Sequence, residues 1–137
     1  MPANGSAHIR IARPSRDLTA ADRFWRTGLG LTELFRHTSG AGEHSLLMLG
    51  WPDACWHLEL TLDPSGMLEP APTPDDLLVV YLGEPVPDDL VARLEHCGGK
   101  RVPAHNSYWD EWGTTVQDPD GYRLVLCERD WSNSADR

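Results

Sequence analysis

Polar and apolar residues alternate along residues 56–62, and the polar residues are of types that can do chemistry. The apolar residues are Trp56, Leu58, Leu60 and Leu62, and the polar ones are His57, Glu59 and Thr61. Successive side chains of a strand point to opposite faces of its sheet. The pattern therefore predicts a strand with one apolar face and one face that presents an imidazole and a carboxylate, groups that bind ligands, act as bases or ligate metals.

A second candidate group lies near the N-terminus. Residues 7–12 alternate around Ile9 and Ile11, which places His8 and Arg10 together on one face of an expected strand. An imidazole can ligate a metal, whereas a guanidinium keeps its proton at physiological pH and cannot. The two residues therefore predict different chemistry, and the sequence leaves the choice between them open.

A third group of polar and aromatic residues lies at residues 105–112, which hold one histidine, one tyrosine, two tryptophans and two acids. We expect a loop here, in which Tyr108 and Trp109 stack on a flat or cationic ligand. The alternative is a loop whose tryptophans close a dimer interface or the edge of a barrel. For Trp112, next to an expected strand, this alternative is favoured.

The elements that must position these groups form two similar series. In the first half we expect a strand at 7–12, a helix at 18–27 and strands at 31–37, 45–49 and 55–62. In the second half we expect a strand at 77–82, a helix from Pro87 to Gly98 and strands at 100–103, 113–117 and 122–127. The order β-α-β-β-β thus occurs twice.

Residues 64–76 hold four prolines in a polar setting and are expected to be an irregular connector between the halves. The sequence therefore predicts one α+β domain spanning residues 1–137. It would consist of a repeat unit at 7–63, the connector, a second unit at 77–128 and a tail at 129–137. The segment Asp118-Pro119-Asp120-Gly121 should be a turn between antiparallel strands, with Gly121 at positive φ.

Composition excludes several classes of function. The chain has 137 residues, 40% of them hydrophobic, and a formal net charge of -9, which would repel nucleic acid and anionic membranes. It has no apolar stretch long enough to cross a bilayer and no start typical of a secreted protein. Three cysteines without CxxC spacing do not indicate a disulfide framework or a zinc knuckle. We therefore expect a cytoplasmic protein with neither nucleic acid nor membrane as a partner.

Two motifs resemble a known superfamily. Asp17-Leu18, Phe24-Trp25 and Gly28-Leu29-Gly30-Leu31 are similar to the opening of vicinal oxygen chelate proteins, which include glyoxalases, bleomycin-resistance proteins and extradiol dioxygenases. The segment from Trp112-Gly113 to Asp118-Pro119-Asp120-Gly121-Tyr122 resembles their closing motif. Residues 106–113 resemble a bacterial branch called YycE-like. The resemblance covers Ile9 to Glu128 and implies two β-α-β-β-β units that form curved, barrel-like sheets of antiparallel or mixed strands.

The glyoxalase-like members of this superfamily hold a divalent metal with four side chains, one on the first and one on the last strand of each unit. Matched without a gap, the four positions fall at Arg10, Glu59, Leu77 and Val125; a two-residue insertion would put His8 in place of Arg10. The resemblance then supplies Glu59 as a ligand and His8 as an uncertain one, and His57 could join from the same face. A shifted set of this kind is the alternative to a site without metal.

The same matching implies that Arg10 and Glu59 are neighbours, with the guanidinium in the place of the metal ion. The predicted ligand-binding residues are Arg10, His57, Glu59, Tyr108, Trp109 and Val125. We expect the protein to bind a small organic molecule in its concave cavity as a homodimer, with no cofactor. The alternative is a lyase, isomerase or dioxygenase that uses a divalent metal on His8, His57 and Glu59, with His105 as a further candidate ligand.

Overall fold

The computed structural model describes residues 2–38 and 44–134. The chain divides into two compact units, Met1–Pro70 and Ala71–Arg137, which are described separately here. The boundary lies inside the predicted proline-rich connector, while the expectation that both units form one domain stays a prediction. In the described part of the chain, the helices are too short or too polar to cross a membrane.

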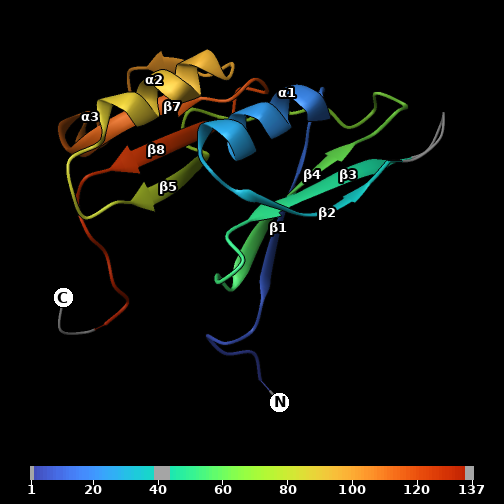
Figure 1. Ribbon diagram of the computed structural model, residues 1–137, viewed down its shortest axis with the longest axis horizontal. Helices are drawn as coiled ribbons and strands as arrows, with labels where there is room; N and C mark the ends of the chain where they lie inside the picture. The colour runs from blue at the N-terminus through green and yellow to red at the C-terminus, as the bar shows by residue number, and fades with distance from the viewer. Residues whose placement is uncertain (1, 39–43, 135–137) are drawn as a thin grey trace. The chain divides into compact units, whose positions relative to one another are not determined.

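The first unit is a four-stranded mixed sheet with a helix against it (Figure 1). Its elements are β1 (Ile9–Pro14), α1 (Leu18–Asp22), the π-helix η1 (Arg23–Gly28), β2 (Thr32–His37), β3 (Ser45–Gly50) and β4 (Trp56–Leu62). The strand order is β1-β4-β3-β2, in which β1 runs parallel to β4 and the other neighbours are antiparallel.

The predicted helix at 18–27 begins where expected but changes its winding. Asp17 caps α1, since its carboxylate accepts a hydrogen bond from the Ala20 N–H at 3.1 Å. From Arg23 the chain continues as a π-helix rather than an α-helix. A π turn holds more residues than an α turn, so the rotation around the helix axis from one residue to the next is smaller. Two adjacent side chains can therefore point toward the same side of the helix. Phe24 and Trp25 are both fully buried and meet edge to face, with ring centroids 4.9 Å apart.

The core of the first unit lies on one face of its sheet. Four fully buried leucines share that face by their register, namely Leu47 and Leu49 of β3 with Leu58 and Leu60 of β4. The helix α1 packs against the same two strands. Each buried leucine contributes on the order of 1.5–3 kcal/mol to folding. This packing fixes which face of β4 carries His57 and Glu59.

A buried carboxylate connects the helical segment to β2. Asp22 is 8% exposed, and its carboxylate pairs with Arg26 at 2.7 Å and with Arg36 of β2 at 3.4 Å. The hydrogen bonds from Arg26 keep the pKa of Asp22 below its ordinary value despite burial, which opposes the lowering. The helix is therefore held to the sheet by charge as well as by its apolar side chains.

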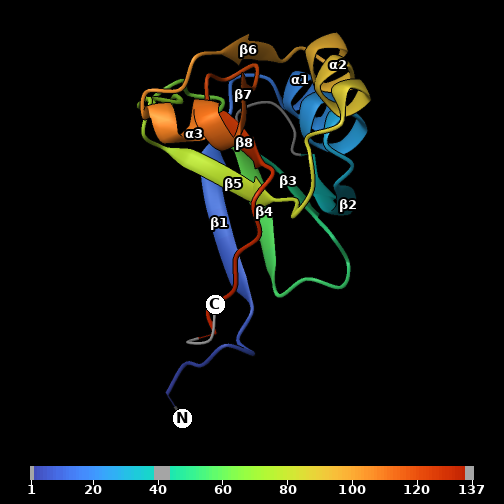
Figure 2. The same cartoon turned by 90° about the vertical axis from the view of Figure 1, so that its left-hand side faces the viewer.

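The second unit repeats the arrangement with one additional helix (Figure 2). Its elements are β5 (Leu77–Tyr81), α2 (Asp88–His96), β6 (Lys100–Val102), α3 (Ser107–Trp112), β7 (Gly113–Gln117) and β8 (Arg123–Cys127). The strand order is β5-β8-β7-β6, with β5 parallel to β8. The predicted α+β class and the repeated β-α-β-β-β order are confirmed.

The prediction of a loop at residues 105–112 was wrong for most of that segment, which forms α3. Asn106 caps this helix, because its side-chain oxygen accepts a hydrogen bond from the Tyr108 N–H at 3.0 Å. Asp110 reaches back to accept the Ala104 N–H at 3.0 Å. These two hydrogen bonds between side chains and the backbone, at Asn106 and Asp110, stabilise a short helix in a segment whose polar and aromatic composition suggested a loop.

The predicted turn between β7 and β8 is confirmed. The Gly121 N–H donates to the Asp118 carbonyl at 3.0 Å, and Gly121 has a φ of 92°. The Asp118 carboxylate accepts the N–H groups of Asp120 and Tyr122 at 2.9 and 2.8 Å. Since a positive φ strains residues with a Cβ atom, glycine is strongly favoured at this position.

Replacement of Gly121 by valine should lower the free energy of unfolding by about 1 kcal/mol or more, because a β-branched residue is strained at this φ. The matched control is Gly5→Val, at a glycine outside the positive-φ set with no atom within 4 Å of an added Cβ. Urea unfolding of the two variants measures the difference. Equal stability of both variants would contradict the assignment of this turn.

Candidate functional site

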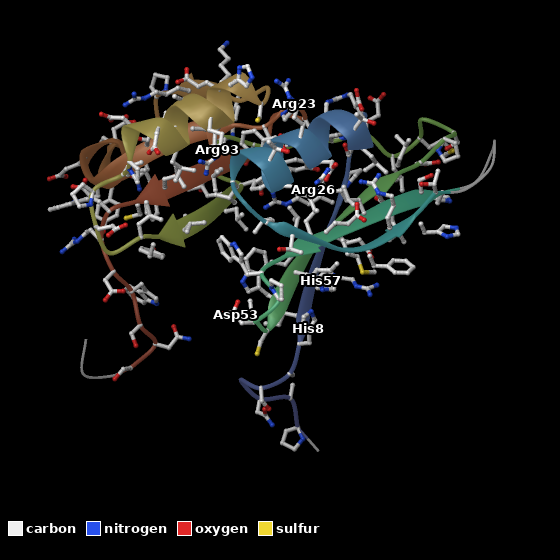
Figure 3. All side chains as sticks on the ribbon, in the orientation of Figure 1. His8, Arg23, Arg26, Asp53, His57 and Arg93 are labelled. Carbon is white, nitrogen blue, oxygen red and sulfur yellow. The ribbon has the colours of Figure 1, made fainter. Side chains whose placement is uncertain are left out.

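The candidate site of the first unit is the sheet face opposite the buried leucines. In the parallel ladder between β1 and β4, Arg10 lies beside His57 and Ala12 beside Glu59. Paired residues of neighbouring strands share a face, so His57 and Glu59 face the same side as Arg10. Figure 3 shows His8 and His57 close together along these two strands. The register thus gathers the polar residues that the sequence placed on separate strands.

Arg10 and Glu59 form an ion pair. Nη1 of Arg10 lies 3.3 Å from Oε1 of Glu59, which confirms the prediction that they are neighbours. The side chain of Glu59 is 9% exposed, whereas that of Arg10 is 54% exposed. Glu59 Oε1 is buried and forms no aligned hydrogen bond within the described part of the chain, so its contact with Arg10 is a charge interaction without hydrogen-bond geometry. The pair therefore joins a buried carboxylate to a guanidinium that still reaches solvent.

Two imidazoles meet beside this ion pair. Nε2 of His8 lies 2.7 Å from Nδ1 of His57, a hydrogen bond in which one ring donates and the other accepts. His57 is 6% exposed, and its buried Nε2 has no hydrogen-bond partner among residues 2–38 and 44–134. Burial lowers the pKa of His57, the positive charges of His8 and Arg10 add to the lowering, and Glu59 opposes it. His57 therefore combines a lowered pKa with a buried ring nitrogen whose hydrogen-bonding capacity is unused in the described part of the chain.

Two further residues belong to this region and were missed by the sequence analysis. A Cβ atom at Gly50 would lie 3.2 Å from Cβ of His57, so this glycine leaves room for the imidazole. Asp53, in the loop between β3 and β4, lies at the end of the sheet where His8 is found (Figure 3). Gly50 could have been found from the sequence, because a glycine at the end of a strand pattern often marks a close approach of another group. Asp53 had no such signal beyond its place in a predicted turn.

The other three predicted ligand-binding residues lie in the second unit. Tyr108 and Trp109 are on α3, with ring centroids 5.0 Å apart at an angle of 83°. Val125 of β8 is fully buried and pairs with Val79 of β5. The structure therefore brings Arg10, His57 and Glu59 together within one unit, and it brings Tyr108 and Trp109 together within the other. Their shared use by one ligand stays a prediction.

The ladder of the second unit also locates the position that matches Arg10. In the first unit, the residue beside Glu59 is Ala12, and Arg10 precedes it by two. In the second unit, the residue beside Val125 is Val79, and Leu77 precedes it by two. Leu77 and Val125 are thus the counterparts of Arg10 and Glu59.

The residues at these four positions do not fit the superfamily's divalent metal. Arg10 cannot ligate a metal, and Leu77 and Val125 offer no ligating atom. In the shifted set, His8 and His57 converge on each other while Glu59 faces Arg10. Across residues 2–38 and 44–134, no three His, Cys, Asp or Glu side chains are placed to hold a metal ion. The side chains at the four matched positions therefore do not supply the ligands that a divalent metal needs.

Comparison with known proteins identifies the family. The model of the YycE-like N-terminal domain matches residues 9–61, and that of the YycE-like C-terminal domain matches residues 75–128. The uncharacterized protein YycE of Bacillus subtilis is 39% identical over 122 residues, which cover 88% of this chain and 87% of YycE. The chain belongs to the YycE-like family.

Solved structures agree with this assignment. A structure of a YycE protein of unknown function from Bacillus subtilis matches the YycE-like chain with a TM-score of 0.80 and 36% identity, over 94% of each chain. Glyoxalase I of Leishmania major matches with a TM-score of 0.66 and 20% identity, over 88% of this chain and 84% of the enzyme. TnmS3, an antibiotic binding protein from Streptomyces sp. CB03234, matches with a TM-score of 0.62 and 22% identity, over 95% and 100%.

These relatives place the YycE-like chain in the vicinal oxygen chelate superfamily, which confirms the resemblance of the sequence motifs. The glyoxalase and the antibiotic binding protein are each less than 25% identical to it and therefore share its fold alone. What the YycE-like chain does must be argued from its own side chains.

A double-mutant cycle on Arg10→Met and Glu59→Gln should give a coupling of about 1 kcal/mol, because half of the Arg10 side chain is in water. Arg10→Met alone should destabilise the protein by leaving a buried carboxylate, and adding Glu59→Gln should recover part of the loss. Urea unfolding at neutral pH measures all four proteins. Strictly additive effects would show that the ion pair contributes nothing to stability.

The lowered pKa of His57 predicts a loss of stability in mild acid. The unfolded chain takes up a proton near pH 6.5 while the folded chain still resists protonation, so the free energy of unfolding should fall as the pH falls below 6.5. Above pH 6.5, the contribution of His57 to the free energy of unfolding should no longer change with pH. His57→Gln should flatten the dependence in urea unfolding at pH 5 and 7.5, whereas His105→Gln, at an exposed histidine, should leave it intact. An unchanged slope in His57→Gln would contradict the assignment.

Proposed function

We propose that this YycE-like protein binds a small organic molecule on the polar face of its first sheet, without a complete metal site of the glyoxalase type. The observation that carries the proposal is the ion pair between Arg10 and the buried Glu59. A guanidinium stands where the superfamily resemblance expects a metal ligand, and it supplies a permanent positive charge there.

The polar groups of this face have unused hydrogen-bonding capacity. Glu59 occupies one edge of the Arg10 guanidinium, whose side chain remains 54% exposed. A guanidinium has five N–H donors, so Arg10 can hold a carboxylate or carbonyl oxygen of a ligand while it contacts Glu59. The buried Nε2 of His57, which has no hydrogen-bond partner among the described residues, would be a second point of attachment once the ligand reaches it. Two directed polar contacts are enough to orient a small molecule.

Apolar side chains flank these anchors. Met48 of β3 pairs with Glu59 on one side and with Phe35 of β2 on the other, so all three share the face. Phe35 is 52% exposed, and Met48 is half-buried. A few polar groups within a larger apolar surface is the usual composition of a site for an organic ligand. The antibiotic binding protein with the same fold is a relative whose name describes such a role.

Ligand screening by thermal shift tests the proposal. A set of small organic acids and amines should include compounds that raise the midpoint of unfolding of the wild-type protein, because binding to the folded state stabilises it. Arg10→Met should reduce these shifts, whereas Arg101→Met, at an exposed arginine in β6, should preserve them. Shifts that are equal in both variants would contradict a ligand anchored on Arg10.

Metal analysis separates the proposal from a metal-dependent enzyme. Protein purified without an affinity tag should contain no stoichiometric transition metal, and calorimetric titration with Ni²⁺, Zn²⁺ and Mn²⁺ should show no tight site. One equivalent of tightly bound metal that is lost in His57→Gln or Glu59→Gln would contradict the proposal. It would instead support a lyase, isomerase or dioxygenase that uses His8, His57 and Glu59.

A further inference from the structure

The second unit has a hollow of its own at the carboxyl end of β5. It has a volume of about 300 Å³ and is lined by Tyr81, Tyr108, Arg129, Asp130 and Trp131. These residues come from the last position of β5, from α3 and from the segment that follows β8. None of them belongs to the polar face of the first unit. The hollow is therefore a candidate site that the proposed function does not use.

Three of its five lining residues are aromatic, namely Tyr81, Tyr108 and Trp131. The ring of Tyr81 lies 6.2 Å from that of Trp131, with an angle of 31° between their planes, and 6.4 Å from that of Trp109. Tyr81, Tyr108 and Trp131 are 38%, 36% and 54% exposed. A flat group inserted between two rings needs about 7 Å, two contacts of about 3.5 Å each. The Tyr81 and Trp131 rings are close to that spacing but tilted by 31°, so a small outward movement and rotation of the Trp131 ring would admit a flat group.

Arg129 gives the hollow its charge. Its guanidinium lies over the ring of Trp112, 4.4 Å from the centroid, and its Nη1 donates to the Tyr108 hydroxyl at 3.4 Å. These two contacts hold the group in one place. Among residues 2–38 and 44–134, no carboxylate lies within ion-pair distance of Arg129. In a chain with a net charge of -9, a fixed arginine without an acidic partner beside exposed aromatic rings points to an anionic ligand.

Asp130 also lines the hollow but has a local structural role. Its Oδ1 accepts the N–H of Trp131 at 2.8 Å, which orients the chain where the tryptophan begins. The indole Nε1 of Trp131 in turn donates to Asn133 at 3.2 Å. Asp130 and Asn133 therefore position the tryptophan ring, and Arg129 is left as the group that meets a charged ligand.

We propose that this hollow binds a planar aromatic carboxylate, whose ring stacks on Tyr81 and Trp131 and whose carboxylate pairs with Arg129. The two kinds of contact are complementary, since the stacking favours any flat apolar group and the guanidinium selects the acid. The sequence analysis placed Tyr108 and Trp109 at a ligand. The structure adds Tyr81, Arg129 and Trp131, which come from outside the segment 105–112.

Calorimetric titration of the full chain with 2-naphthoate tests the proposal, with 2-naphthamide and 2-naphthylmethylammonium as neutral and cationic probes of the same ring. We expect 2-naphthoate to bind most tightly. Arg129→Gln should weaken 2-naphthoate about tenfold and leave 2-naphthamide unchanged, because it removes only the charged hydrogen bonds. Trp131→Ala should weaken both probes about fivefold through lost stacking. The matched control is Arg101→Gln, which removes an exposed arginine of the same unit.

Nuclear magnetic resonance locates the bound probe. The indole N–H signal of Trp131 should shift on addition of 2-naphthoate, and the shift should survive Arg10→Met, which removes the anchor of the first unit. The proposal is overturned if 2-naphthoate does not bind, if the ammonium probe binds more tightly, or if Arg129→Gln and Arg101→Gln behave alike. It is also overturned if Trp131→Ala changes self-association in light scattering while the affinity for 2-naphthoate stays the same.

Discussion

The parallel pairing of β1 with β4 is the constraint on which the chemistry of the first unit depends. The four leucines buried against the helix fix the orientation of β3 and β4. The register of β1 then places Arg10 beside His57 and within reach of Glu59. A shift of one residue would turn every side chain of β1 to the opposite face, so that Arg10 would meet the leucines. The apolar core therefore decides which polar residues meet on the opposite face of the sheet.

The two units share a topology but differ in the chemistry of equivalent positions. Where the first unit has Arg10 and Glu59, the second has Leu77 and Val125 at the same places in the ladder. The polar and aromatic residues Tyr108, Trp109 and Arg129 of the second unit lie instead on α3 and after β8. A duplicated framework has thus kept its backbone pairing while the side chains on it changed independently.

The sequence predicted the parts of this structure that follow from periodicity and from local turn chemistry. Alternation along residues 56–62 located both faces of β4, and Gly121 marked the turn before β8. The π turn at Arg23 was not predicted, because the apolar periodicity of this segment also fits an α-helix; the turn coincides with two adjacent aromatic residues that are both buried in the core. The helix α3 was missed because its cap, Asn106, was treated as part of a polar loop. Both errors concern tertiary or capping contacts that override composition.

The sequence predicted the part of the site that lies on the strand pair β1 and β4. The proximity of Arg10 and Glu59 followed from the superfamily resemblance, which matched both residues to metal-ligand positions on strands that are distant in the sequence. The contact between His8 and His57 did not, because the sequence offered His8 and Arg10 as alternatives for one position. In the structure both are used: Arg10 faces Glu59, and His8, two residues earlier on the same face, meets His57. A strand presents every second residue to one face, so the alternatives were compatible.

Replacement of a metal ligand by arginine changes what the first unit can do to a bound molecule. A divalent cation can exchange a water ligand for a substrate oxygen and polarise it, whereas a guanidinium donates hydrogen bonds in fixed directions and keeps its proton. Proton transfer would fall to the two imidazoles, of which His57 is neutral at pH 7 because burial lowers its pKa. Its Nδ1 is engaged with His8, while its Nε2 has no hydrogen-bond partner among the described residues. In the tautomer whose Nδ1–H donates to His8, Nε2 could accept a hydrogen bond or a proton from a ligand held by Arg10, and in the other tautomer it would donate a hydrogen bond. Under the proposed function, either arrangement serves recognition of a small molecule rather than activation of vicinal oxygens.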